Sequence, residues 1–159
     1  MLHSSLPDPE KLRLRMAGLC SRSEQCTYDI RLKLRKARLS AAKIDEIIEF
    51  LIGNKFLSDQ RYARAFASYK VRFSAWGRIK IRAYLSQKRI PSRFISEALD
   101  DIDEKDYADA LHRAALAKAA SLNLNDPEER SKLYRHLLSR GFESSLISRQ
   151  IESLRNESI

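Results

Sequence analysis

An internal repeat constrains the fold of this 159-residue chain more than any other feature of its sequence. Six large apolar residues recur three times, at an offset of 51 residues and then of 52, with no gap inside the aligned window. Such a pattern indicates one supersecondary unit used three times. The three sets are Ile30, Leu34, Leu39, Ile44, Ile48 and Leu51; Ile81, Leu85, Ile90, Ile95, Leu99 and Ile102; and Leu133, Leu137, Phe142, Ile147, Ile151 and Leu154.

Each copy of the repeat contains two helices joined by a tight turn, because its apolar residues follow helical spacing on both sides of a break. In the first copy the break is followed by Ser40, a residue type that caps helix N-termini. In the second copy Pro91 suits a first helical turn, and in the third Gly141 suits a helix C-terminus. The turn residues and the apolar pattern therefore agree.

A further helix precedes each pair, at residues of about 9–21, 59–73 and 104–121. The chain has only four Gly and four Pro, which are few for a turn-rich β protein. The sequence predicts an all-α fold of three tandem three-helix repeats of about 50 residues, arranged as an elongated, curved, right-handed array. The predicted repeats are residues 1–57 with a short lead-in, residues 58–102 and residues 103–159.

Charge is distributed unevenly along the chain. The net charge is +9, yet residues 11–94 hold 21 basic and 6 acidic side chains, while residues 95–159 hold 9 and 13. Such asymmetry indicates a polyanionic partner for the first two thirds of the chain, and nucleic acid is the commonest partner of this kind.

Arginines form a stripe in the first copy, where Arg31, Arg35 and Arg38 follow i, i+4, i+7 spacing about 100° round the helix from the apolar residues. The aligned positions of the second copy include Arg82 and Arg89, whereas the third copy has no cation there. Since the apolar pattern is kept in all three copies, the fold itself does not require the cationic stripe.

Closely spaced cations on a helix repel one another unless an anion lies across them, and the arginine fork pairs with phosphate. The alternative is a solvated face whose long side chains cover apolar surface. We expect phosphate binding, with nearby lysines adding to the positive field. The candidate residues are Arg31, Lys33, Arg35, Lys36, Arg38, Arg72, Arg78, Lys80, Arg82, Lys88 and Arg89.

Four aromatic residues, Tyr62, Phe66, Tyr69 and Phe73, recur at helical spacing between the first and second apolar sets. Exposed rings can stack on nucleic-acid bases, but a stripe at this period is more often part of a core. We therefore expect the four rings to be buried.

Catalysis finds little support, because the chain has neither a glycine-rich phosphate loop nor an HExxH motif. Cys20 and Cys26 lack the spacing of a metal site, so two buried thiols in a reducing cytoplasm are expected, with no cofactor and no small-molecule substrate. Charges interrupt every apolar run, which predicts a cytoplasmic protein that does not span a membrane.

The segment "FLSDQRYARAFASYKVRFSAWGRIKIRAYLSQKRIP" resembles the signature of the RecX family, the bacterial modulators of the RecA recombinase. The resemblance extends from about Cys20 to the C-terminus. One departure is Arg89, where the family often has glycine. The matching elements are Phe56, Leu57, Ser58, Asp59, Tyr62, Ala63, Phe66, Gly77 and Ile90.

The resemblance implies a non-catalytic inhibitor that seats in the groove of the RecA–single-stranded DNA filament and limits its growth, ATP hydrolysis and strand exchange. One alternative is a direct DNA- or RNA-binding protein of helix-turn-helix type, although Arg and Lys without Asn or Gln favour contacts to phosphates over base readout. Another alternative is a helical adaptor for acidic proteins.

Overall fold

The computed structural model describes residues 5–158, and these residues form α-helices and no strand, as predicted. The predicted cap Ser40 accepts a hydrogen bond from a first-turn N–H, and Asp8 and Ser58 cap the helices that follow them in the same way. Pro91 differs slightly, since it precedes the helix instead of standing in its first turn. The helices are α1 (Pro9–Arg22), α2 (Thr27–Lys36), α3 (Ala41–Gly53), α4 (Asp59–Ser74), α5 (Arg78–Gln87), α6 (Ser92–Asp100), α7 (Glu104–Ala119), α8 (Pro127–Ser139) and α9 (Ser144–Glu157).

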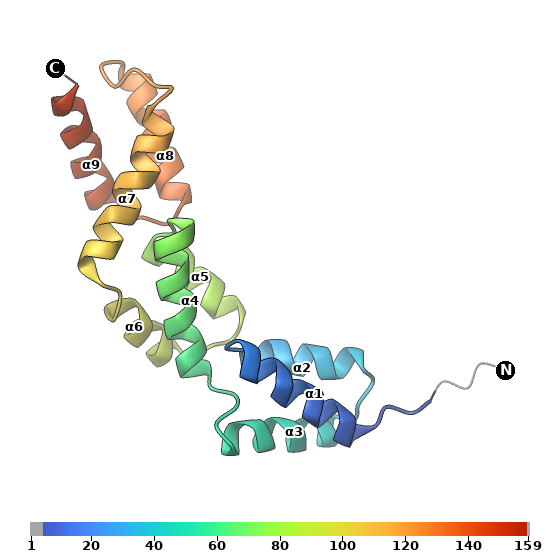
Figure 1. Ribbon diagram of the computed structural model, residues 1–159. Helices are drawn as coiled ribbons and strands as arrows, with labels where there is room; N and C mark the ends of the chain where they lie inside the picture. The colour runs from blue at the N-terminus through green and yellow to red at the C-terminus, as the bar shows by residue number, and fades with distance from the viewer. Residues whose placement is uncertain (1–4, 159) are drawn as a thin grey trace.

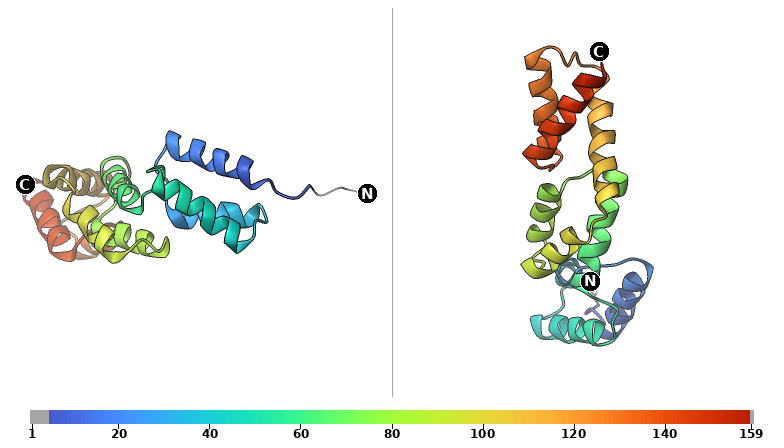
Figure 2. Two further views of the ribbon diagram at one scale, coloured as in Figure 1. Left: turned by 90° about the horizontal axis from the view of Figure 1, so that it is seen from below. Right: turned by 90° about the vertical axis from the view of Figure 1, so that its left-hand side faces the viewer.

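The helices form an elongated array that bends between α3 and α4 (Figure 1). Two further views show α4–α9 continuing as one rod, with α1–α3 set at an angle to its end (Figure 2). In Figure 1 the middle helix of each group, α2, α5 and α8, lies toward the inner side of the bend. These three helices occupy the same position in each copy of the sequence repeat. The repeat therefore places equivalent surfaces along one side of the molecule.

The buried core is also divided where the array bends, between α3 and α4. All the recurring apolar residues are buried, as the repeat predicts. Those of α1–α3 pack into one cluster that ends at Leu57, while those of α4–α9 share a second cluster. A three-helix unit of about 50 residues buries limited apolar area alone, so sharing a core increases the area that two units remove from water.

The turns after α2, α5 and α8 have the same backbone geometry. Arg38, Arg89 and Gly141 stand at equivalent positions with φ angles of 65°, 55° and 93°. In each turn the next residue donates its N–H to a carbonyl in the last turn of the helix, which is the Schellman arrangement. Arg38 and Arg89 therefore lie beyond the helix ends, unlike the predicted continuous helical stripe.

The first turn of α5 is capped by residues of the third helix group. The N–H of Gly77 donates to the Arg140 carbonyl at 2.8 Å, and the N–H of Ile79 donates to the Gly141 carbonyl at 3.0 Å. Between them, the N–H of Arg78 donates to the Tyr107 hydroxyl at 3.0 Å. Three successive donors that would otherwise lack intrahelical partners are thereby satisfied across one junction.

Candidate polyanion-binding surface

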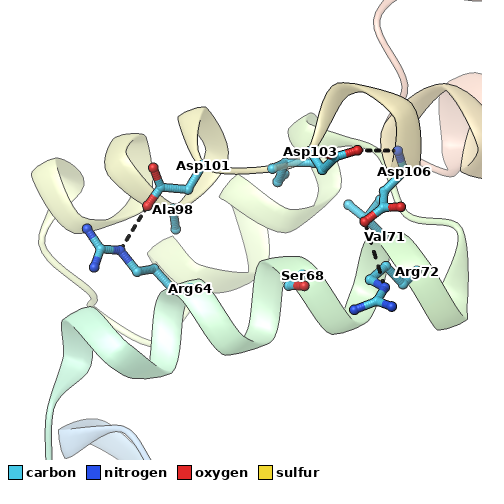
Figure 3. A pocket seen from close by; sticks show the side chains of 9 residues that line it. Arg64, Ser68, Val71, Arg72, Ala98, Asp101, Asp103 and Asp106 are labelled. Carbon is cyan, nitrogen blue, oxygen red and sulfur yellow. Dashed lines mark hydrogen bonds and ion pairs between the residues drawn. The ribbon is translucent and has the colours of Figure 1, made fainter.

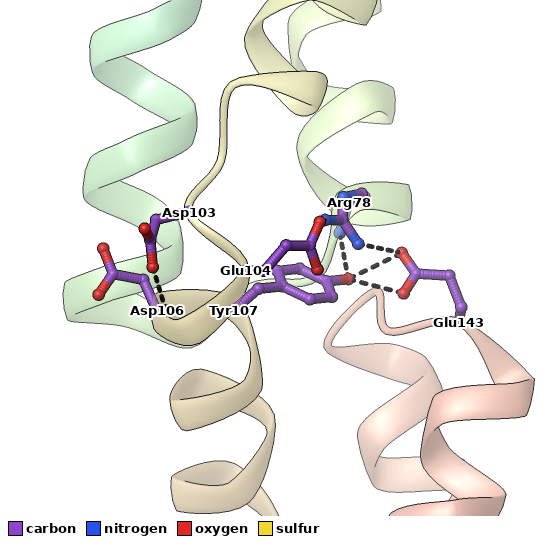
Figure 4. Close-up of polar contacts among 6 residues, drawn as sticks. All are labelled: Arg78, Asp103, Glu104, Asp106, Tyr107 and Glu143. Carbon is purple, nitrogen blue, oxygen red and sulfur yellow. Dashed lines mark hydrogen bonds and ion pairs between the residues drawn. The ribbon is translucent and has the colours of Figure 1, made fainter.

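The predicted cations fall into distinct surroundings, and Arg78 is one of those that the structure partly encloses. Its guanidinium group lies 3.9 Å from the centroid of the Tyr107 ring. The same group is 3.2 Å from a Glu104 oxygen and 3.7 Å from a Glu143 oxygen (Figure 4). Arg78 therefore joins α5 to α7 and to the start of α9, which leaves its charge neutralised within the chain.

Arg72 is also paired with a carboxylate. Arg72 lies 3.7 Å from Asp106. Arg64, about two helical turns earlier on α4, lies 3.0 Å from Asp101. Both pairs line a small cavity of about 120 Å³ between α4 and the α6–α7 connection (Figure 3). Because each arginine faces an aspartate, this cavity presents both signs of charge and is a poor site for a polyanion.

Four of the predicted cations converge where α2 meets the turn after α5. Arg31 and Arg35 come from α2, while Lys88 and Arg89 come from the end of α5 and its turn. They line a cavity of about 180 Å³, which we call the junction cavity. Its other lining residues are Thr27, Tyr28, Leu32 and Asp59.

The four cations of the junction cavity are not equally free. Arg31 is 2.8 Å from Asp45, and Lys88 is 2.7 Å from Asp29, whose hydrogen bond outweighs burial and raises the pKa of Lys88. Arg35 and Arg89 are exposed, and within residues 5–158 neither has a carboxylate within ion-pair distance. These two guanidinium groups are the ones available to an external anion.

A further group of cations surrounds Trp76, just after α4. The Lys80 ammonium lies 4.4 Å from the Trp76 ring centroid, and the Lys70 ammonium lies 4.5 Å from it. Burial, reinforced by the charges of Arg140 and Lys70, lowers the pKa of Lys80. The sequence prediction included Lys80 but missed Lys70 and Arg140, which lie outside the repeated stripe.

A series of contacts connects the two groups of cations. Lys88 lies 5.7 Å from the Tyr28 centroid and 5.5 Å from the Tyr84 centroid. The Tyr84 ring in turn meets the Trp76 ring at 6.0 Å, and Arg89 also lies 5.7 Å from Tyr28. We call this series the cation–aromatic row. It consists of Arg89, Tyr28, Lys88, Tyr84, Trp76, Lys80 and Lys70.

Only part of the cation–aromatic row could be predicted from the sequence. Lys80, Tyr84 and Lys88 follow i, i+4, i+8 spacing and so share one flank of α5. Arg82, two residues from Tyr84, projects from the other flank because successive helical residues are about 100° apart. The repeated arginine stripe and the cation–aromatic row therefore occupy different sides of α5, and only the aromatic residues distinguish them.

Relatives of known classification match most of the chain. The models described as the second and third three-helix domains of RecX match residues 58–99 and 104–151. A regulatory protein RecX from Prosthecochloris aestuarii is 33% identical over 147 residues, which are 92% of this chain and 95% of that protein. The chain belongs to the RecX family. A second RecX, from Pseudomonas savastanoi pv. phaseolicola, is 30% identical and covers 91% of this chain and 92% of its own.

Solved RecX structures have the same fold. One crystal structure of a regulatory protein RecX aligns with a TM-score of 0.77 and 25% identity, over 88% of this chain and 70% of that one. RecX from Lactobacillus salivarius aligns with a TM-score of 0.78, over 92% and 96% of the two chains. Its 24% identity supports the fold alone. RecX proteins are classed as regulatory proteins, so membership of the family places this chain among non-catalytic regulators.

The remaining predicted cations of this RecX chain are exposed and lie outside the row. They are Lys33, Lys36, Arg38 and Arg82, and in the described part of the chain none has a carboxylate within ion-pair distance. Their participation in binding stays a prediction.

The aromatic stripe of α4 divides into two halves. Tyr62 and Phe66 pack against the shared core, as predicted. The prediction of burial is wrong for Tyr69 and Phe73, which are 58% and 67% exposed. At these two positions α4 faces solvent, and the two rings contact each other with centroids 5.0 Å apart.

Both cysteines of this RecX chain are buried free thiols, as predicted. Burial raises the pKa of Cys26 to about 12, so its thiol stays protonated and unreactive near neutral pH. Across residues 5–158, none of the helices combines the length and apolar character needed to cross a bilayer.

Proposed function

We propose that this RecX chain binds the RecA–single-stranded DNA filament through the junction cavity and the cation–aromatic row, and thereby limits filament growth, ATP hydrolysis and strand exchange. Membership of the RecX family supports RecA as the regulated protein. The observation that carries the proposal is a row of cations interleaved with aromatic rings across two successive junctions of the array, in which Arg89, Lys80 and Lys70 have no carboxylate within ion-pair distance among residues 5–158.

The chemistry of the row suits a long anionic partner better than a small one. Arg35 and Arg89 present planar donors that can pair bidentately with a phosphate, and Lys80 and Lys70 provide a second positive position beyond Tyr84. A partner that contacts both positions must extend along the molecule. A nucleoprotein filament in the cytoplasm satisfies this requirement because its DNA carries one phosphate per nucleotide.

The helix-turn-helix alternative would require the first turn of a middle helix to enter a duplex groove. For α5 this turn is covered, since the N–H groups of Gly77, Arg78 and Ile79 all bond to the third helix group. This arrangement argues against α5 as a reading helix.

The double variant Arg35→Gln/Arg89→Gln is expected to need roughly tenfold more protein for half-maximal inhibition, because a loss of about 1.4 kcal/mol of binding corresponds to that factor. Glutamine keeps much of the side-chain length and removes only the charge. The measurement is the ATPase activity of preformed RecA–single-stranded DNA filaments, titrated at several salt concentrations. With two phosphate contacts gone, the slope of log affinity against log salt should become shallower by roughly 1.4.

A matched control is Arg15→Gln/Arg22→Gln on α1, which removes two exposed arginines that, within residues 5–158, have no carboxylate within ion-pair distance. The control should inhibit like the parent. Equal losses in the two double variants would show that net charge alone matters. Parent-like inhibition by Arg35→Gln/Arg89→Gln would refute the proposed surface.

A further inference from the structure

Trp76 is the single tryptophan of the chain, and it is half-buried at the end of α4. The Phe66 and Tyr84 rings meet it nearly edge-on, both with centroids 6.0 Å away. Lys70 and Lys80 bring their ammonium groups within about 4.5 Å of its centroid. A large aromatic surface and two cations are therefore combined at one point of the molecule.

The backbone fixes this cluster in place. Ala75 adopts a left-handed conformation with φ 50°, and the N–H of Trp76 donates to the Lys70 carbonyl at 3.0 Å. The Arg140 side chain donates to the carbonyls of Ser74 and Ala75, so a residue of the third helix group holds this turn. A preorganised cluster loses little conformational entropy when a ligand arrives.

The cluster also has unbalanced charge. Lys70, Lys80 and Arg140 are all positive, and among residues 5–158 none of them has a carboxylate within ion-pair distance. Their mutual repulsion contributes to the lowered pKa of Lys80. A bound anion would remove this repulsion, whereas a surface that serves only solubility usually mixes both signs of charge.

We propose that the Trp76 cluster is a binding site for single-stranded nucleic acid, in which Lys70 and Lys80 contact a phosphate and a base packs on the aromatic group. The cluster is the part of the cation–aromatic row that lies outside the junction cavity. The proposal therefore deepens the proposed function and rests on it for the kind of polymer that the row binds. Stacking on aromatic rings combined with backbone cations is the usual chemistry of single-strand binding.

The alternative occupant is an acidic segment of a protein. Such a segment supplies carboxylates to the lysines but has no base to pack against Trp76, Tyr84 and Phe66. A nucleotide uses both halves of the cluster, so the geometry favours the nucleic acid.

Intrinsic fluorescence tests the site directly, because Trp76 is the only tryptophan in the chain. The probes are a short oligothymidylate, an abasic oligomer of equal length and a polyglutamate of equal charge, each added to the full chain without RecA. We expect saturable quenching by oligothymidylate, weaker quenching by the abasic oligomer and little response to polyglutamate. Lys70→Gln/Lys80→Gln should weaken oligothymidylate binding roughly tenfold, whereas Arg15→Gln/Arg22→Gln should leave it unchanged.

Three outcomes would overturn the assignment. Oligothymidylate binding detected by anisotropy without any change at Trp76 would place the strand elsewhere. Equal quenching by polyglutamate would assign the cluster to an acidic protein segment. Parent-like affinity of Lys70→Gln/Lys80→Gln, with parent-like thermal unfolding, would show that the two lysines do not bind the strand. RecA inhibition is measured separately on the same variant, so this proposal can fail while the proposed function stands, or the reverse.

Discussion

Replacing Gly77 by alanine is expected to destabilise the chain by about 2–3 kcal/mol, because the added methyl group overpacks a closed junction. A Cβ atom at Gly77 would lie 2.2 Å from both the carbonyl carbon and the oxygen of Gly141, and 2.4 Å from the Phe142 nitrogen. All three neighbours are backbone atoms, so rotation of a side chain cannot relieve the clash. The turn after α8 would have to move away from α5.

Such a movement would also break hydrogen bonds. The N–H groups of Gly77 and Ile79 lose the carbonyls of Arg140 and Gly141 when the turn withdraws. The φ of Gly77 is −84°, which alanine adopts without strain, so backbone strain at residue 77 contributes nothing to the expected effect. The measurement is urea unfolding of the parent and the variant, followed by far-UV circular dichroism.

Gly18→Ala is the matched control for the same chemical change. Gly18 lies inside α1, and a Cβ there would meet nothing within 4 Å. Because alanine is the better helix former, this variant should gain up to about 1 kcal/mol of stability. If Gly77→Ala unfolded at the same urea concentration as the parent, the close approach of α5 to the α8–α9 turn would be absent in solution.

The core of this RecX chain was predictable from the sequence because the same positions are buried in each copy of the repeat. Each apolar residue of the set from Ile30 to Leu51 recurs 51 positions later and again after a further 52, and it is buried in all three copies. Helix periodicity fixes which side of a helix is apolar, and that side must face a core whatever the tertiary arrangement. Local caps such as Ser40 were equally predictable, since they depend on residues a few positions apart.

The RecX signature has a physical basis in these local and near-local contacts. Leu57 and Ala63 are buried, and Ser58 caps α4. Asp59 accepts a hydrogen bond from the N–H of Thr27 at 2.8 Å, so it caps α2 from the neighbouring helix group. Only the role of Asp59 as a cap of α2 could not be predicted from the segment alone.

The candidate site was less predictable, because counting cations does not show which of them meet carboxylates. Lys88 pairs with Asp29 and Arg78 with Glu143, and both partners are distant in the sequence. The same pattern of basic residues thus contains structural ion pairs and free guanidinium groups. Trp76 and Tyr84 were missed for a related reason, since their association with lysines depends on how α4 and α5 pack.

Tyr107→Phe is expected to cost about 2–3 kcal/mol, because it leaves one buried donor unpaired and removes a hydrogen bond to a charged group. The Tyr107 side chain is almost fully buried. Its hydroxyl accepts from the Arg78 N–H at 3.0 Å and donates to Glu143 at 2.8 Å (Figure 4). Phenylalanine fills the same volume but offers Arg78 no acceptor and Glu143 no donor.

The control is Tyr69→Phe, an exposed ring whose hydroxyl has no protein partner within residues 5–158, so its stability should stay within about 0.5 kcal/mol of the parent. A double-mutant cycle of Tyr107→Phe with Glu143→Gln should show coupling of about 1 kcal/mol or more, since the two groups are in direct contact. Additive effects would mean that the hydroxyl and the carboxylate act independently. If Tyr107→Phe itself unfolded like the parent, the hydroxyl would contribute nothing, and Tyr107 would stabilise the junction only through the packing of its ring.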